Sequence, residues 1–444
     1  MSTFGELTAP KVEQTGPGGD GAFVYVDISS IDNQGKRIVE PKRLSTDAAQ
    51  SRARQRLQKG DVLISMTRPN LNAVAIVPPD LDGAIGSTGF HVLRANADAD
   101  PHWLYYAVQS NSFVKAMCDL VKGALYPAVR PKDIREYSIN PPPLAKQREI
   151  VAELEKQFSR LNEAVANLQR VKANLKRYKA SVLKSAVEGR LVETEASIAH
   201  REGRSYETGE QLLQRILEER RAKWSGRGKY KLPASPLKDG LPPIPDGWTW
   251  SNADQLTHLI TSGSRGWGDF YSDTGVLFIR AQDIKTDALN LPDAARVDVP
   301  IDAEGTRSSV TEGDILVTIT GANVTKSALV PALGELAFVS QHVALMKLAM
   351  PETASFVFSW IVSPANGRKV LESWAYGAGK PGLSLEQVRA LPIALPPLAE
   401  QARIVAEVDR HLSIVREVES EVDTNLKRTQ ALRQATLQKA FCTS

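Results

Sequence analysis

The sequence has few of the residues on which disulfide-stabilised and metal-dependent proteins rely. It contains only two cysteines and six histidines among 444 residues, and no two histidines have the HxxxH or HExxH spacing of a metal site. A disulfide framework and a cysteine-built zinc site are therefore excluded. The N-terminus also lacks a basic region followed by an apolar core, so we expect a cytoplasmic protein.

Long hydrophobic runs are absent as well. No uncharged apolar stretch reaches the roughly 18 residues that a transmembrane helix needs, so we expect no membrane partner. Hydrophobic residues make up 42% of the chain and charged residues 24%, which is usual for a folded protein. The length indicates two or three domains.

Two short segments resemble catalytic motifs, but each lacks a required residue. Residues 140–143 read Asn-Pro-Pro-Pro, like the Asn-Pro-Pro-aromatic motif of amino-methyltransferases without its aromatic residue. Residues 377–380 read Gly-Ala-Gly-Lys, but the first glycine of a P-loop would fall at Trp374, and Pro381 replaces the Ser or Thr that binds Mg²⁺. We therefore predict no catalytic residue, no metal site and no cofactor bound by this chain.

Positive charge is concentrated in one segment. Residues 36–59 hold eight basic and two acidic residues, whereas residues 242–395 hold 11 basic and 16 acidic ones. The net charge of +4 is only a weak indication of an anionic partner. Charge alone does not predict nucleic-acid binding.

Three blocks of the sequence recur at a nearly constant offset. Residues 142–154 read PPLAKQREIVAEL and residues 396–408 read PPLAEQARIVAEV, with nine of thirteen positions identical. The other matching pairs are 60–77 with 313–330, and 123–127 with 377–381. A shared boundary between prolines and a helix would explain one block but not three, so the sequence is interpreted as a duplicated module.

Each module is predicted to end in a long helix. After three prolines, residues 144–188 contain no proline or glycine, and their apolar residues alternate at spacings of three and four, the heptad pattern of a coiled coil. The second copy runs from residue 397 to about residue 441. Each helix would be about 65 Å long. Because that length overshoots a domain of about 140 residues, we expect the two helices to pair, rather than each covering only its own domain.

The globular parts carry alternating β-branched runs with helical segments between them. Strands are expected at residues 23–28, 62–66, 276–279 and 315–319, and helices at 103–121 and 356–372. The predicted fold class is α+β, with two mixed α/β domains joined by two long helices that pair as an antiparallel coiled coil, in a pseudo-two-fold duplicated module. The predicted boundaries are 1–142 for the first domain, 143–190 for the central helix, 191–240 for a charged linker with a helix at 208–224, 241–395 for the second domain, and 396–444 for the C-terminal helix.

The duplicated layout resembles the specificity subunits of type I restriction-modification enzymes. The resemblance is carried by the two PPLAxQxxIVAE blocks, by LKSAVEGRL at 183–191, by ILEERRAKW at 216–224 and by PDGW at 245–248. It covers nearly the whole chain. One departure is that PDGW has no counterpart before the first domain, so either the start of that domain is trimmed or the C-terminal end of the chain covers the gap.

The resemblance implies a protein that reads double-stranded DNA and leaves catalysis to its partners. Each target-recognition domain would read one half of an asymmetric split site, and the helices would act as a ruler between the half-sites. Two methyltransferase subunits would dock on the helices, and restriction subunits would join them. S-adenosylmethionine, ATP and Mg²⁺ are expected in those partner subunits.

The residues that read bases are predicted from the hydrogen-bonding chemistry of their side chains. Arg or Lys recognises guanine, and Asn or Gln recognises adenine, when a loop presents them in the major groove. Loops 67–72 and 320–326 occupy matching places in the two copies and favour this role; the alternative is a pair of polar hairpins in solvent. The predicted base-reading residues are Arg68, Asn70, Asn72, Asn323, Thr325 and Lys326.

Three further groups are predicted to contact DNA. Segments 126–132 and 376–380 match each other, and both combine aromatic and basic residues. The glycine-rich segment 262–267 is either a clamp on DNA or a turn capped by a core tryptophan. The basic run near the N-terminus favours phosphate contact over base reading. These candidates are Tyr126, Arg130, Lys132, Tyr376 and Lys380; Arg265 and Trp267; and Lys36, Arg37, Arg43 and Arg54.

Gln147 and Gln401 are matched polar residues in the first turns of the two long helices. They are candidates for docking the methyltransferase subunits, with helix capping as the alternative. Two other functions stay open at this point. A coiled-coil scaffold with duplicated protein-binding domains would show no salt-dependent DNA binding, and a fused methylase-nuclease would bind S-adenosylmethionine by itself.

Overall fold

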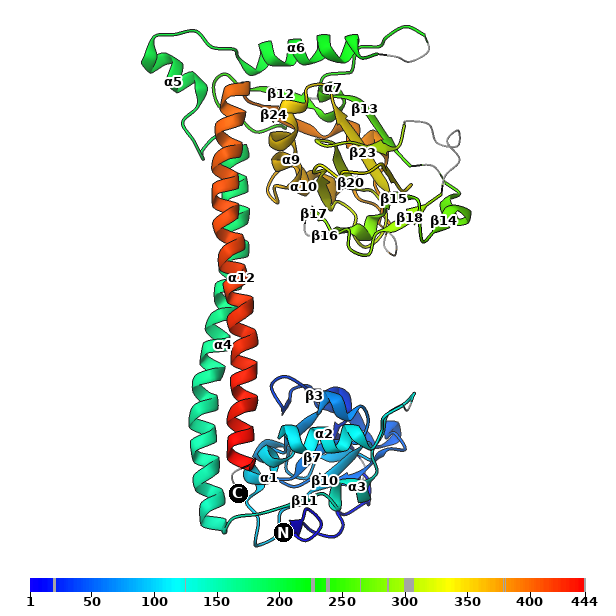
Figure 1. Ribbon diagram of the computed structural model, residues 1–444, viewed down its shortest axis with the longest axis vertical. Helices are drawn as coiled ribbons and strands as arrows, with labels where there is room; N and C mark the ends of the chain where they lie inside the picture. The colour runs from blue at the N-terminus through cyan, green and yellow to red at the C-terminus, as the bar shows by residue number, and fades with distance from the viewer. Residues whose placement is uncertain are drawn as a thin grey trace. The chain divides into compact units, whose positions relative to one another are not determined.

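The computed structural model describes residues 1–18, 21–123, 125–224, 228–236, 240–263, 265–285, 287–298, 307–377, 379 and 381–442. The chain divides into two compact units, Met1–Val171 with Glu421–Ser444 and Lys172–Ser420. Each unit contains one mixed α/β domain and part of each of two long helices, α4 (Leu144–Val187) and α12 (Leu398–Cys442), shown in Figure 1. The predicted fold class of two mixed domains and two paired long helices is confirmed.

The first domain is built on two main sheets. Its strands are β1 (Ser2–Thr3), β2 (Ala22–Val26), β3 (Ile31–Asp32), β4 (Arg37–Ile38), β5 (Lys42–Ser45), β6 (Ala53–Arg56), β7 (Val62–Ser65), β8 (Val74–Ile76), β9 (Ile85–Ser87), β10 (Phe90–Leu93) and β11 (Ser138–Ile139). One sheet has the order β5-β2-β9-β6, in which β2 and β9 are parallel, and the other has the antiparallel order β10-β7-β8. The pairs β1–β11 and β3–β4 are separate short ribbons.

The second domain repeats this topology. Its strands are β12 (Thr249–Asn252), β13 (Thr257–Ser262), β14 (Tyr271–Ser272), β15 (Val276–Ile279), β16 (Ile284–Lys285), β17 (Ala288–Leu289), β18 (Ala295–Val297), β19 (Ser309–Val310), β20 (Ile315–Thr318), β21 (Ser327–Leu329), β22 (Ala337–Val339), β23 (Val343–Leu348) and β24 (Pro392–Leu395). The order β18-β15-β22-β19 matches β5-β2-β9-β6, and its parallel pair, β15 with β22, is in the same place. The order β23-β20-β21 matches β10-β7-β8, so the duplicated sequence folds as a duplicated topology. The second domain adds one edge strand to each of these sheets, β14 beside β18 and β13 beside β23.

Short helices cover the sheets of both domains. They are α1 (Pro101–Ala107), α2 (Asn111–Asp119) and α3 (Pro131–Arg135) in the first domain, and α9 (Ala354–Val362), α10 (Gly367–Trp374) and α11 (Leu385–Ala390) in the second. Each single helix expected at 103–121 and 356–372 is therefore two helices. Ser110 begins a new helix by accepting the N–H of Phe113 at 3.4 Å, and Pro364 cannot continue the helix before it.

The last turns of each long helix complete the core of the domain in the same unit. In the first unit, Leu437 is fully buried and the ring of Phe441 lies 5.6 Å from that of Trp103. In the second unit, Leu183 and Val187 of α4 are buried in the core that contains Trp248. The end of α12 thus packs against the first domain, which is one of the two possibilities left open by the missing PDGW counterpart.

The two long helices run antiparallel. In the first unit, the guanidinium of Arg433 stacks 4.1 Å from the ring centre of Phe158 and donates to Asn162 at 3.3 Å. In the second unit, the Tyr178 hydroxyl lies 2.7 Å from Nδ1 of His411. Position along α4 rises as position along α12 falls, so the predicted pairing of the helices is confirmed.

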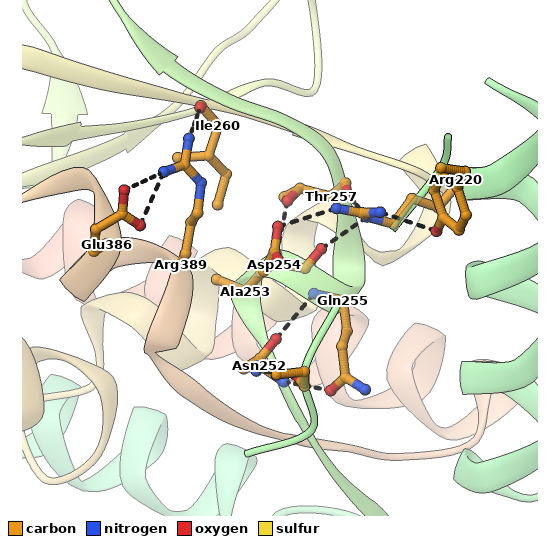
Figure 2. Close-up of polar contacts among 11 residues, drawn as sticks. Arg220, Asn252, Ala253, Asp254, Gln255, Thr257, Ile260, Glu386 and Arg389 are labelled. Atoms are coloured by element: carbon orange, nitrogen blue, oxygen red, sulfur yellow. Dashed lines mark hydrogen bonds and ion pairs between the residues drawn. The ribbon is translucent and has the colours of Figure 1, made fainter. Parts of the chain in front are cut away.

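The linker is fastened to the second domain. It contains α5 (Glu195–Glu202) and α6 (Gly209–Ala222), and Leu212 and Ile216 of α6 are fully buried. Figure 2 shows Arg220 at the end of α6 donating to the carbonyls of Asp254 at 3.1 Å and Thr257 at 2.8 Å. Arg220 also pairs with the Asp254 carboxylate at 3.1 Å, so α6 is part of this domain's fold.

Candidate nucleic-acid interface

In the first domain, two segments predicted separately as DNA-binding lie side by side. Thr67 and Ala128 form an antiparallel bridge, and the Arg68 N–H donates to the Pro127 carbonyl at 2.8 Å. The Val129 N–H donates to the Met66 carbonyl, also at 2.8 Å. Loop 67–72 and segment 126–132 therefore form one surface feature, here called the first junction.

The second domain contains the same junction. Thr320 and Gly382 form an antiparallel bridge, and the Gly321 N–H donates to the Pro381 carbonyl at 2.9 Å. The Leu383 N–H donates to the Ile319 carbonyl at 2.8 Å. Loop 320–326 thus meets residues 381–383 through the same three backbone contacts, and a bridge joins Tyr376 to Gly382. We call this feature the second junction.

The first junction presents most of its predicted residues to solvent. Arg68 and Asn70 are exposed, and the Tyr126 side chain is 85% exposed. Arg130 pairs with Asp133 at 3.0 Å, and Lys132 lies 3.5 Å from Glu136, but both cations remain more than 70% exposed. The junction therefore combines an amide, an aromatic ring and three accessible cations, which are the groups that contact bases and phosphates.

Backbone strain is concentrated at the junctions and at the hairpins beside them. Among the described residues, five other than glycine have positive φ: Lys36, Arg68, Asn72, Asp287 and Thr325. Arg68, Asn72 and Thr325 lie in loops 67–72 and 320–326, and the other two end the turns of the β3–β4 and β16–β17 hairpins. Such conformations cost about 1–3 kcal/mol each and cluster at functional sites. Their clustering supports the choice of these loops.

The second junction corrects part of the prediction. Thr325 is only 2% exposed, so its hydroxyl cannot reach a base. Asn323 is half-buried, and its Nδ2 donates to the Ala281 carbonyl at 3.1 Å, which makes it a brace of its own loop. Lys326 is half-buried and Tyr376 is 65% exposed. Lys380 lies outside the described residues.

Trp267 is a core residue, and its predicted contact with DNA is wrong. It is 7% exposed and packs on Phe278, with ring centres 4.8 Å apart, and on Phe338 at 6.0 Å. The alternative of a glycine-rich turn capped by a core tryptophan is the one the structure supports. Arg265, two residues earlier, is exposed.

The basic run does not form one continuous patch. Arg43 is on β5 and Arg54 on β6, which are opposite edges of the same four-stranded sheet. Arg37 is exposed and lies 3.8 Å from Asp32. Lys36 is half-buried and its ammonium donates to the Asn72 carbonyl at 2.5 Å, so its predicted role as a free phosphate contact is corrected.

The two glutamines do not offer docking surfaces. Gln147 is 1% exposed; its Oε1 accepts the Asp100 N–H at 2.8 Å, and its Nε2 donates to the carbonyls of Asp98 and Pro142. Gln401 is also 1% exposed and donates to the Pro396 carbonyl at 2.9 Å. Both side chains satisfy backbone groups where the helices begin, so the capping alternative holds and the docking prediction is wrong.

The sequence did not predict two features beside the first junction. Leu125 is 87% exposed beside Tyr126, and the inward turn of Lys36 gave no signal in a run of otherwise exposed cations. In the described part of the chain, no group of three or more His, Cys, Asp or Glu side chains is placed to hold a metal ion. Nor do the described helices include one long and apolar enough to cross a membrane.

Comparison with known proteins finds similarity to one family. Residues 19–172 match the family model of the type I restriction modification DNA specificity domain. The chain is 26% identical over 317 residues to the specificity subunit of type I restriction enzyme EcoBI from Escherichia coli, covering 68% of this chain and 56% of that subunit. It is 21% identical over 361 residues to the EcoKI specificity subunit from E. coli strain K12, covering 79% of this chain and 67% of that subunit. The matches thus span about half to two thirds of these relatives.

A solved structure extends the comparison to nearly the whole chain. It is described as "Structural basis underlying complex assembly and conformational transition of the type I R-M system". It matches with a TM-score of 0.67 and 26% identity, covering 99% of this chain and 96% of that one. The resemblance of this chain to the specificity subunits of type I restriction-modification enzymes, expected from its repeated blocks, is therefore confirmed.

Proposed function

We propose that this chain is the non-catalytic specificity subunit of a type I restriction-modification system, and that each domain reads one half of an asymmetric split DNA site. The observation that carries the proposal is the pair of junctions. In each domain the loop that follows β7 or its counterpart β20 is joined to a second loop by matching backbone bonds. Duplicated loop surfaces that differ in side chains suit a site of two different halves.

The chemistry of the first junction supports base reading in particular. Arg68 is exposed on a strained loop, so its guanidinium can reach the two acceptors that guanine presents in the major groove. Asn70, also exposed, is suited to adenine. Arg43 and Arg54 lie on the edge strands of the domain's other main sheet and suit phosphate contact, which is independent of sequence.

The experiment that tests this function is methylome sequencing of the host with and without this gene. We expect one bipartite methylated motif to disappear when the gene is deleted, with one modified adenine in each half. Purified chain with its methyltransferase partner should also bind DNA carrying that motif in preference to scrambled DNA, with a strong dependence on salt. A methylome that is unchanged by the deletion would favour the scaffold function instead.

We further propose that the two long helices set the spacing between the half-sites. Inserting four residues into both helices, near Leu168 and Val422, adds about one turn, or roughly 5–6 Å, to each. The unspecified spacer of the methylated motif should then lengthen by one or two base pairs. A motif with its original spacer in this variant would remove the ruler role while leaving base reading intact.

Two methyltransferase subunits and the restriction subunits are the proposed protein partners. S-adenosylmethionine, ATP and Mg²⁺ would be bound in those partners, and this chain would supply DNA recognition and a platform. Native mass measurement of the purified assembly should give two methyltransferase subunits per chain. Saturation at one subunit would mean that the repeated sequence does not repeat the docking site.

A further inference from the structure

Lys36 lies at the end of the β3–β4 turn, and its side chain points to the reading loop. Its Nζ donates to the Asn72 carbonyl at 2.5 Å and lies 3.5 Å from the Leu71 carbonyl. These carbonyls belong to loop 67–72, about 35 residues away in the sequence. A lysine from a separate hairpin therefore holds the loop that presents Arg68 and Asn70.

The position of the ammonium follows from the geometry of the loop. Residues Pro69–Leu71 form a 3-10 turn between two left-handed residues, Arg68 with φ 50° and Asn72 with φ 44°. The carbonyls that follow such a turn lack partners within it, and the partial negative charge there favours a cation. Lys36 satisfies these carbonyls, which offsets part of the cost of the strained backbone.

Lys36 is itself fixed by two other elements. The Tyr105 hydroxyl of α1 donates to the Lys36 carbonyl at 2.8 Å, and the Lys36 N–H donates to the Asp32 carbonyl at 2.7 Å. Tyr105 is 8% exposed, so this contact comes from the domain core. The hairpin, the helix and the reading loop are thus connected through one residue whose ammonium is engaged with protein carbonyls.

The second domain holds its loop in a different way. The corresponding residue of the β16–β17 turn is Asp287, which also has positive φ but pairs with Arg368 of α10. The loop there is braced by Asn323, which donates to the Ala281 carbonyl at 3.1 Å. Each copy thus has its own brace, and a change in one brace should alter only its own loop.

We infer that Lys36 is a positioning residue, which sets the conformation of loop 67–72 and through it the base preference of the first half-site without touching DNA. This inference rests on the proposed reading function. It predicts an effect confined to one half of the recognised sequence. A phosphate contact would instead weaken binding to every sequence alike.

The test compares three variants of the full chain in complex with its methyltransferase partner. Duplexes bound from a randomised library are sequenced for wild type, Lys36→Met, Lys36→Arg and Lys42→Met. Lys36→Met should lower the preference for the correct base in the first half-site by about tenfold, the scale of losing one well-oriented base contact. Lys36→Arg, which can still donate to the carbonyls, should restore most of it.

Two internal controls separate positioning from general damage. The second half-site should keep its wild-type preference in every variant. Lys42→Met should also leave both half-sites unchanged, because the Lys42 ammonium pairs with Asp27 at 2.5 Å and belongs to a different ion pair of the same domain. If Lys36→Met does not fold, Tyr105→Phe removes the hydroxyl that bonds the Lys36 carbonyl and leaves the ammonium in place, so it should produce a smaller loss in the first half-site.

Three results would overturn the inference. The first is an unchanged base preference at the first half-site in Lys36→Met, and the second is an equal loss of base preference at both half-sites. The third is a salt dependence of binding that falls by about one unit while base preference is unchanged, which indicates a phosphate contact. Failure of the proposed function looks different. In that case wild type itself would select no split sequence from the library.

Discussion

The first turns of α4 and α12 have nearly the same sequence and different surroundings. Lys146 of α4 stands where α12 has Glu400. Lys146 is exposed and pairs with Glu149 at 2.8 Å. Glu400 is fully buried, where it accepts Nε1–H of Trp248 at 2.9 Å and the N–H of Glu195 at 2.8 Å. Burial raises the pKa of the Glu400 carboxyl, which shows how closely it is enclosed.

The reason is that the linker covers one first turn. Glu195 of α5 is 3% exposed, and its carboxylate forms an ion pair with Arg403 at 2.6 Å. Ile404, next to Arg403, is fully buried. In the first unit the matching face of α4 borders an open cavity of about 980 Å³, whose lining includes Ile150 of α4 and Leu432 of α12. Leu432 is 55% exposed. Duplication repeated the helices and their capping glutamines, but it did not repeat what covers them.

Exchanging the two charged residues should give the largest effect. Glu400→Lys places a cation in a buried site, beside Arg403 and against two N–H donors, and should lower the free energy of unfolding of the second unit by about 3–5 kcal/mol. Lys146→Glu, its matched control, changes an exposed side chain and should alter stability by less than about 0.5 kcal/mol. Denaturant unfolding of the full chain, with hydrogen exchange in α5 as the local probe of the second unit, measures the change in stability of both variants.

Equal effects of these two exchanges would contradict the difference in burial. A strong loss from Lys146→Glu in particular would mean that the cavity beside α4 is closed in solution. The same pair of variants also tests the proposed docking of methyltransferase on the long helices. Only Lys146→Glu should change binding without changing the fold.

The capping glutamines give the next largest contrast. Gln147 satisfies three backbone groups, whereas Gln401 donates to one carbonyl and its Oε1 is buried without a partner in the described structure. Because a buried group left unsatisfied costs about 1–3 kcal/mol, Gln147→Ala should lower the free energy of unfolding by about 3 kcal/mol and Gln401→Ala by about 1 kcal/mol. Thermal unfolding of the two variants compares them. A larger loss at Gln401 would mean that water or another group satisfies its oxygen.

Much of the fold could be predicted because repetition is a global signal. The matching blocks fixed two modules, and the proline-to-helix boundary placed α4 and α12 within a few residues. The meeting of loop 67–72 with segment 126–132 was not predicted, since no local pattern indicates a bridge between Thr67 and Ala128. The sequence did show that both segments recur in the second copy at nearly the same offset.

The roles of single side chains were harder to predict than the elements that carry them. A glutamine in a first turn suits capping and docking equally, and only its three bonds to backbone groups decide for Gln147. Trp267 follows a glycine-rich turn, but Phe278 and Phe338 come from strands that the sequence does not place beside it. Lys36 is one of eight cations in its run, and its inward direction depends on a loop 35 residues away.

The two reading loops should respond differently to loss of their polar residue. Arg68→Ala removes an exposed guanidinium and should relax one base position of the first half-site, at a cost of about 2 kcal/mol in discrimination, without lowering the melting temperature. Asn323→Ala removes a brace that donates to the Ala281 carbonyl, so it should broaden several positions of the second half-site and destabilise the loop. Binding to singly substituted duplexes, with melting curves alongside, measures both. If Arg68→Ala weakens all sequences equally, Arg68 contacts phosphate.

The smallest expected effect is a pH dependence that belongs to one hairpin. Burial, reinforced by Arg433 and only partly opposed by Asp32, lowers the pKa of Lys36 from its usual 10.5 to about 8. The other ionisable group in contact with it, the Tyr105 hydroxyl, has its pKa raised by burial. Between pH 8 and 10.5 the folded chain therefore binds fewer protons at Lys36 than the unfolded chain, and folding becomes more favourable as pH rises.

Comparison with Lys36→Met isolates this contribution, because every other titrating group is common to both proteins. The difference in unfolding free energy, wild type minus variant, should grow by about 1 kcal/mol across that window, a value reduced for the partial exposure of the ammonium. The second copy has Asp287 in place of this lysine. For Asp287→Asn, the difference in unfolding free energy from wild type should therefore stay constant between pH 8 and 10.5. A flat difference for Lys36→Met would mean that solvent surrounds the ammonium, which could then not hold the Asn72 carbonyl firmly enough to set the reading loop.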